Sequence, residues 1–179
     1  MIHTIRIGRL LRETVTTPYR NLVTRPTGAA VRNRIEQALA RSDCLTAYLD
    51  FSDVELLDLS CADEVVAKLL MTEVGPVRFV VLSGLREDQH EAIEHVLTHH
   101  RLAIAAVPHG DRSPRLLGWV TADARAAFGC IGERGSMRAD EVAEALGWAE
   151  SRAEQALDAL SLHRLVRRDG NLHHPLPIA

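Results

Sequence analysis

The segment Leu49–Asp63 reads LDFSDVELLDLSCAD and decides how the chain is interpreted. An apolar strand pattern runs to Phe51, a short acidic loop follows, and a serine stands where a helix pattern begins. The spacing Ser60-Cys61-Ala62-Asp63 is that of a capping box, which predicts Ser60 as the helix N-cap. Phosphate also binds well at helix N-termini, so the sequence leaves open a second role for Ser60 as a phospho-acceptor.

The loop itself carries several carboxylates. We expect Asp53, Glu55, Asp58 and Ser60 to form a loop that binds a protein partner. The carboxylates of Asp50, Asp53, Glu55 and Asp58 could instead hold a divalent cation, but the segment lacks the glycine-containing ligand loop of a calcium site. Cys61 is expected to pack in the core, with redox sensing as the weaker alternative.

Strand and helix patterns alternate on both sides of this segment. Helical patterns alternate with apolar runs that are short and rich in β-branched residues, as strands are. The expected strands are 2–7, 45–51, 77–82 and 102–107, and the expected helices are 28–42, 61–73 and 87–100. This alternation predicts an α/β domain with a mostly parallel sheet covered by helices. The arginine-rich stretch before Gly28 is expected to be an extended edge segment.

The amino-acid composition of the sequence changes after Val107. The stretch PHGDRSPRLLG is rich in proline and glycine, which is typical of a linker. Helical patterns at 122–130, 139–146 and 149–163 follow, and Asp169-Gly170 indicates a β-hairpin. This order predicts a winged helix-turn-helix. We therefore expect an α/β domain over 1–110, a linker over 111–120 and a winged helix-turn-helix domain over 121–179. Its expected core residues are Val142, Leu146, Ala153, Leu157, Leu160, Leu162 and Val166.

Composition narrows the functional classes. The net charge of −3 argues against a broadly basic surface for nucleic acid. No apolar run is long enough to cross a membrane, and arginines interrupt the apolar residues at the N-terminus, so we expect a cytoplasmic protein without a membrane partner. Three cysteines without a CxxC pair predict reduced core thiols.

A family resemblance follows from LDFSDVELLDLSCADEVVAKLL, supported by TRPTGAAVRNRIEQAL and VVLSGL. These segments resemble the STAS domain of anti-sigma factor antagonists and, more closely, the STAS-like domains of unknown function. The resemblance covers roughly 2–107 and implies a mixed sheet covered by helices and a regulatory protein partner, such as a kinase or an anti-sigma-like factor. Asp58 matches the family's aspartate, but Leu59 occupies the position of its phosphorylated serine, which leaves Ser60 as a displaced acceptor.

The C-terminal part resembles the winged helix-turn-helix modules of bacterial and archaeal regulators. In a DNA-binding version, the helix beginning near Ala149 would enter the major groove. The residues expected to contact DNA are Ser151, Arg152, Gln155, Arg164, Arg167 and Arg168. Glu150 and Glu154 oppose this role, and so does the balance over 122–179 of seven arginines against nine acidic residues. DNA binding and protein docking, including formation of a homodimer, therefore remain as alternatives.

The histidine-rich helix pattern offers a metal site as a less favoured reading. Glu91, His95 and His99 follow one another at four-residue steps and share a helix face. The sequence contains no HExxH motif, no GxSxG turn and no glycine-rich phosphate loop. We therefore expect a non-enzymatic regulator of transcription without a cofactor. The alternative is a metal or small-ligand sensor that uses this helix or the acidic loop.

Overall fold

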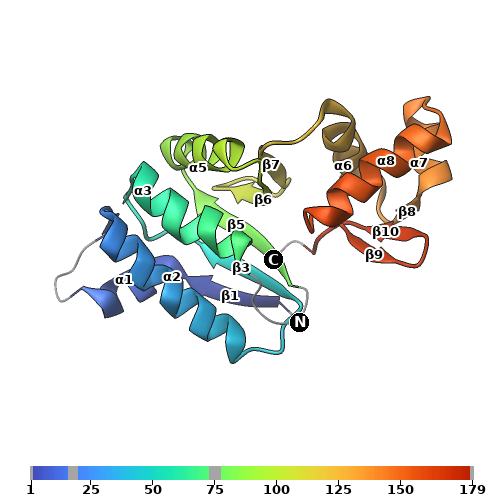
Figure 1. The fold of residues 1–179 in the computed structure, drawn as a ribbon. Helices are drawn as coiled ribbons and strands as arrows, with labels where there is room; N and C mark the ends of the chain where they lie inside the picture. Colours follow the sequence, from blue (N-terminus) through green and yellow to red (C-terminus); the bar gives the residue numbers. More distant parts are fainter. Residues whose placement is uncertain (1, 16–19, 73–77, 178–179) are drawn as a thin grey trace. The chain divides into compact units, whose positions relative to one another are not determined.

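A computed structural model describes residues 2–15, 20–72 and 78–177 (Figure 1). The chain divides into two compact units, Met1–Trp119 and Val120–Ile178, called unit 1 and unit 2 below. No helix in the described ranges is both long enough and apolar enough to cross a membrane.

Unit 1 is built on a five-stranded mixed sheet in the order β1-β3-β5-β6-β7. Neighbouring strands run parallel from β1 to β6, and β7 runs antiparallel to β6. The strands are β1 Ile2–Arg6, β3 Thr46–Asp50, β5 Phe79–Leu85, β6 Ala103–Pro108 and β7 Arg115–Gly118. The mixed α/β architecture expected from the alternating patterns is therefore present.

One hydrophobic core joins this sheet to its helices. The helices are α1 Ile7–Thr14, α2 Arg25–Ala40, α3 Leu59–Ala62, α4 Lys68–Met71 and α5 Glu87–His99. A π-helical turn, η1 Asp63–Ala67, connects α3 to α4. Buried residues of every helix contribute to the core, and in the longer helices α1, α2 and α5 these apolar residues recur at the spacing of one helical face.

Two expectations for unit 1 are wrong. The stretch before Gly28 is not a single extended segment, since Ile7–Thr14 forms α1 with Ile7 and Leu11 buried. The expected linker 111–120 contains β7, whose end closes tightly on β6. Gly118 has φ +102°, and a Cβ there would lie 2.1 Å from the carbonyl oxygen of Leu102, so only glycine fits.

A second, small pairing brings two loops together in unit 1. Strand β2 Asn21–Leu22 pairs in parallel with β4 Leu56–Leu57. The backbone of Asp58 continues this contact by donating to the carbonyl of Leu22 at 3.2 Å. The loop before α2 is thereby fastened to the loop before α3.

Unit 2 consists of three helices and a three-stranded antiparallel sheet in the order β8-β10-β9. Along the chain its elements are α6 Ala122–Arg134, β8 Met137–Arg138, α7 Ala139–Leu146, α8 Glu150–Leu162, β9 Arg167–Asp169 and β10 Leu172–His174. The hairpin predicted at Asp169-Gly170 is confirmed, and Gly170 has φ +59°.

The core of unit 2 differs from expectation at Leu146, which is only partly buried, and more strongly at Leu162. Leu162 is 81% exposed, although it continues the apolar pattern of α8. The helix ends at Leu162, and the next residues turn through Arg164, which has φ +56°. This turn places Leu165 and Val166 in the core in place of Leu162.

Candidate functional site

The Asp58 carboxylate begins the helix at α3 and is the centre of the first candidate site. Its Oδ1 accepts a hydrogen bond from the backbone N–H of Cys61 at 2.7 Å and another from the Ser60 hydroxyl at 2.9 Å. Its Oδ2 accepts from the backbone N–H of Thr24 at 3.0 Å. Burial alone would raise the pKa of Asp58, but these bonds, led by those from Cys61 and Thr24, lower it.

The expected role of Ser60 as N-cap is therefore wrong. Asp58 is the N-cap, and Ser60 lies inside the first turn of α3. Asp58 and Ser60 are both residue types that cap helices and lie two positions apart, and the hydrogen bond from the N–H of Thr24 favours the aspartate. The geometry also opposes a role for Ser60 as a phospho-acceptor. A phosphate on its hydroxyl would lie against the Asp58 carboxylate, and the two negative groups would repel each other.

Thr24 carries an unusual backbone conformation at this point. Its φ is +69°, which is rare for a β-branched residue. Three contacts hold it there: its N–H binds Asp58, and its carbonyl accepts from the N–H of Gly28 and from Cys61 Sγ at 3.0 Å. Strained residues persist where the surrounding structure fixes them, and such positions concentrate at functional sites.

Cys61 is a core residue, as expected. It is fully buried, and burial followed by the charge of Asp58 raises its pKa to about 12. A thiol in this state is neither nucleophilic nor easily oxidised. Burial and the raised pKa of Cys61 both argue against the redox alternative. Cys44 and Cys130 are likewise free and buried.

A network of charged groups lies beside this cap and was not anticipated from the sequence. Arg25 Nη1 lies 2.8 Å from Asp63 Oδ2 and 2.8 Å from Glu64 Oε1. Arg32 Nη1 lies 3.2 Å from Glu64 Oε2, and Lys68 pairs with the same carboxylate. His100 Nε2 lies 2.8 Å from Asp63 Oδ1.

Glu64 is the centre of this ion network, with only 3% of its side chain exposed. Glu64 lies close to the surface, because the side chains of its partners Arg25 and Lys68 are themselves 51% and 39% exposed. Burial would raise the pKa of Glu64, yet the hydrogen bonds from Lys68 and Arg25 outweigh it and lower the pKa. The only sequence signal was the four-residue spacing of Glu64 and Lys68.

Two exposed leucines flank Asp58. Leu56 is 51% exposed on β4 and Leu59 is 50% exposed at the start of α3. We call these two residues the leucine pair. These two side chains leave apolar surface exposed close to the Asp58 cap.

The remaining residues of the expected partner-binding loop lie on the surface. Asp53 and Glu55 are exposed, and Glu55 makes an ion pair with Arg20 at 3.5 Å. The Asp50 side chain accepts from the N–H of Ser52. These carboxylates do not converge with Asp58, whose oxygens are already bound by Thr24, Ser60 and Cys61.

The histidine-rich helix does not assemble a metal site. Glu91, His95 and His99 lie exposed on α5. Within residues 2–15, 20–72 and 78–177, no three His, Cys, Asp or Glu side chains are grouped closely enough to hold a metal ion. Among the described residues, neither the helix nor the acidic loop therefore provides the three grouped ligands that the metal-sensor alternative needs.

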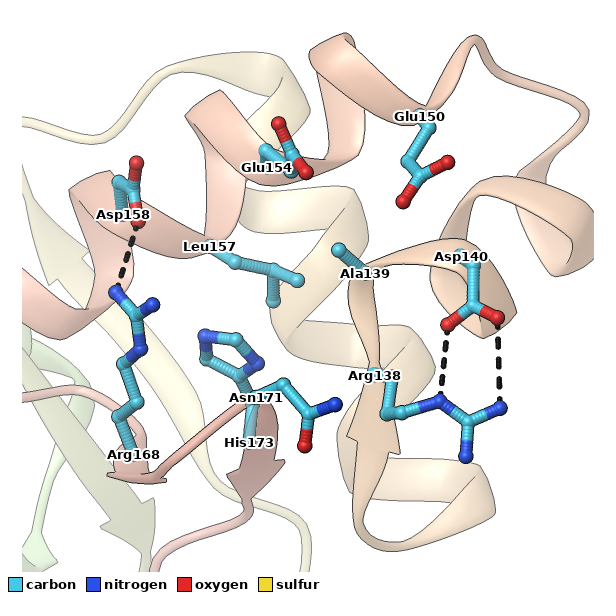
Figure 2. A pocket seen from close by; sticks show the side chains of 10 residues that line it. All are labelled: Arg138, Ala139, Asp140, Glu150, Glu154, Leu157, Asp158, Arg168, Asn171 and His173. Atoms are coloured by element: carbon cyan, nitrogen blue, oxygen red, sulfur yellow. Dashed lines mark hydrogen bonds and ion pairs between the residues drawn. The ribbon is translucent and has the colours of Figure 1, made fainter.

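Unit 2 contains a hollow of about 560 Å³ between α8, the start of α7 and the β9–β10 hairpin, which we call the α8 groove (Figure 2). Its lining includes Asp140, Glu150, Glu154, Asp158, Arg168 and His173. Arg168 pairs with Asp158 at 3.4 Å, and Arg138 at the rim pairs with Asp140 at 3.1 Å. The groove is therefore acidic, with both arginines already engaged.

The residues expected to contact DNA are only partly available. Arg152 binds Asp123 with two hydrogen bonds of 2.8 and 2.9 Å and stacks over Trp148 at 4.4 Å. Ser151 and Gln155 are exposed on α8, beside its row of acidic residues. Arg164 and Arg167 are exposed and make no ion pair within the part of the chain that the structure describes.

Comparison of the chain with protein-family models, with curated proteins and with solved structures gives no match.

Proposed function

We propose that the chain is a non-enzymatic regulator that acts through protein contacts. In this proposal unit 1 is a STAS-like domain that binds a protein partner at the surface around Asp58. Unit 2 is a winged helix-turn-helix module that docks on a second macromolecule. Control of transcription is the process in which such a combination is expected.

The leucine pair is the observation that carries the proposal. Leu56 and Leu59 are half exposed and stand, along the chain, on either side of a carboxylate that accepts three hydrogen bonds from its own protein. Asp58 therefore gives the surface a fixed shape, and the two leucines give it the apolar area that a partner can bury. Leu59 stands where the resembling family has its phosphorylated serine, so an apolar contact replaces a charge switch.

The arrangement of elements supports the two domain assignments. In unit 1 the strand β3, the acidic loop that contains Asp58 and the helix α3 follow one another along the chain. The helices of this unit share one hydrophobic core with the mixed sheet. In unit 2 the order is helix, strand, two helices and a hairpin, and the first strand joins the hairpin. That order is the one of winged helix-turn-helix modules.

Site-specific photo-crosslinking in cells tests the surface. A photoreactive amino acid placed at Leu56 or Leu59 should capture the same partner protein. Leu45 is a matched control, because it is 42% exposed but precedes β3, at the other end of the strand from the leucine pair. The proposal fails if the two positions capture nothing, or only the proteins that Leu45 also captures.

DNA contact through unit 2 is a second candidate, favoured by the unpaired Arg164 and Arg167. Two cations this close in the chain would contact phosphates and give a shallow salt dependence, with a slope of about −2 in a plot of log affinity against log salt. A mobility-shift titration of the full chain on duplex DNA measures that slope, and Arg167→Gln should reduce it by about one.

A further inference from the structure

We propose that the α8 groove binds an extended segment of a partner protein that carries arginines at alternate positions. The inference deepens the docking role proposed for unit 2 and does not depend on the leucine pair of unit 1.

The first observation is a row of carboxylates on α8. Glu150, Glu154 and Asp158 follow one another at four-residue steps, so all three line the same side of the helix (Figure 2). Asp158 is paired with Arg168. Glu150 and Glu154 have no ion-pair partner among the described residues, and two acceptor groups are therefore available on successive turns.

The second observation is a buried histidine in the same groove. His173 on β10 is 4% exposed, and neither ring nitrogen makes a hydrogen bond with any residue that the structure describes. In Figure 2 its ring lies between Leu157, Asn171 and Arg168 in the lining of the hollow. Buried polar atoms in proteins are nearly always paired, so the two unpaired nitrogens mark an unsatisfied polar position in the lining of the groove.

The ring is neutral at neutral pH. Burial, followed by the charge of Arg168, lowers the pKa of His173, while the backbone of Met137 opposite it on β8 acts in the other direction without normal hydrogen-bond geometry. A neutral imidazole offers one acceptor nitrogen and one N–H donor. A peptide supplies both complements, because its N–H groups donate and its carbonyls accept.

The spacing of the carboxylates fits an extended chain. Residues four apart on a helix differ by about 6 Å along its axis. Alternate residues of an extended peptide lie about 6.4 to 6.8 Å apart and point to the same side. Arginines at alternate positions can therefore face Glu150 and Glu154 together, and a planar guanidinium can bind a carboxylate through two N–H groups.

Two other occupants fit less well. DNA phosphates would face the unpaired Glu150 and Glu154, which repel them. A metal ion would need a third ligand, and no group of three ligating side chains lies within the described part of unit 2. The peptide uses both the carboxylates and the histidine.

Amide NMR on the isotope-labelled full chain tests the proposal with the peptide acetyl-Gly-Arg-Gly-Arg-Gly-amide as probe. We expect saturable shifts at residues 150–158 and 171–173. A peptide with citrulline in place of arginine removes the charge and should give no shifts. A peptide with adjacent arginines keeps the charge but loses the spacing, and it should bind more weakly.

Variants locate the site. Glu154→Gln should weaken binding about threefold and the double variant Glu150→Gln/Glu154→Gln about tenfold, as expected for exposed ion pairs. Glu133→Gln on α6 is the matched control, because Glu133 is exposed, outside the groove and loses the same charge. His173→Phe keeps a ring in the groove but removes both nitrogens, and it should also weaken binding.

The proposal is overturned by absence of shifts at millimolar peptide, by equal effects of Glu154→Gln and Glu133→Gln, or by equal binding of the citrulline peptide. Shifts of the groove amides that depend on protein concentration alone would assign the groove to a second copy of this chain. Stronger shifts with duplex DNA or zinc would likewise overturn it. Crosslinking at Leu59 tests the partner surface of unit 1, and the peptide titration tests the α8 groove of unit 2. Failure of one proposal therefore leaves the other unaffected.

Discussion

Replacing Asp58 by alanine should loosen unit 1 while leaving unit 2 unchanged. The carboxylate accepts from the N–H of Cys61, the hydroxyl of Ser60 and the N–H of Thr24. Loss of an N-cap costs about 1 kcal/mol. Loss of the charge-assisted bond to Thr24 adds about 1.5 kcal/mol.

The sum is about 2.5 kcal/mol, which corresponds to a change of roughly 70-fold in an opening equilibrium. Ser60→Ala should cost less than about 1 kcal/mol, since it removes one of the three donors and the carboxylate remains satisfied. Asp58→Asn should fall between the two, because its amide oxygen still accepts but carries no charge.

Hydrogen exchange with peptide mass spectrometry measures these effects in each unit separately. In Asp58→Ala, amides of 59–71 should exchange roughly 70-fold faster, whereas those of 150–162 in α8 serve as an internal control and should not change. The double variant adds a test of mechanism. Because the Ser60 hydroxyl donates to Asp58, Ser60→Ala should have almost no effect once Asp58 is gone.

Two results would refute this reasoning. An effect of Ser60→Ala as large as that of Asp58→Ala would identify the serine as the cap. Strictly additive effects in the double variant would mean that the hydroxyl acts on something other than the carboxylate.

Three further predictions concern the helices around this cap. The pKa of Glu64 is lower in the folded chain than its ordinary value of 4.5, so its contribution to stability should be complete above pH 4.5 and lost as the pH falls through the folded pKa. Urea unfolding between pH 7 and pH 3 should show this loss of stability. In Glu64→Gln the dependence of stability on pH should be weaker. Gly28→Ala should destabilise unit 1 by about 1 kcal/mol in the same assay, despite the higher helix propensity of alanine, because the added Cβ would lie 3.0 Å from Glu64 Cβ and 3.1 Å from Cys61 Sγ. Cys61, with its pKa of about 12, should resist iodoacetamide at pH 8 in the folded chain and react in urea; rapid alkylation of the folded protein would contradict its burial.

The sequence predicted those features that depend on local patterns. The alternation of strands and helices, the hairpin at Asp169-Gly170 and the boundaries of α7 follow from periodicity and turn residues. Helix α1 was missed, although Ile7 and Leu11 have helical spacing, because the surrounding arginines suggested an open segment. The spacing of these two apolar residues is the local signal for α1.

The candidate sites depend on contacts between distant residues, which a local pattern does not contain. Asp58 rather than Ser60 caps the helix because Thr24, 34 residues earlier, also binds it. Glu64 can be buried because Arg25 and Arg32 come from another helix to cover it. In unit 2, the spacing of Glu150 and Glu154 was visible, but the groove appears only when the hairpin brings His173 beside α8.

The π-helical turn Asp63–Ala67 has a consequence for the evolution of this surface. A π turn arises when one extra residue is accommodated within an α-helix. Deleting one residue there would restore regular α-helical winding, and because the wide turn absorbs the extra residue, the helical segments on either side would keep their register. Asp58 and the leucine pair before the turn and Leu69 of α4 after it would then keep their places. Single-residue length variation among natural homologues should therefore fall at Asp63–Ala67, with the acidic cap retained.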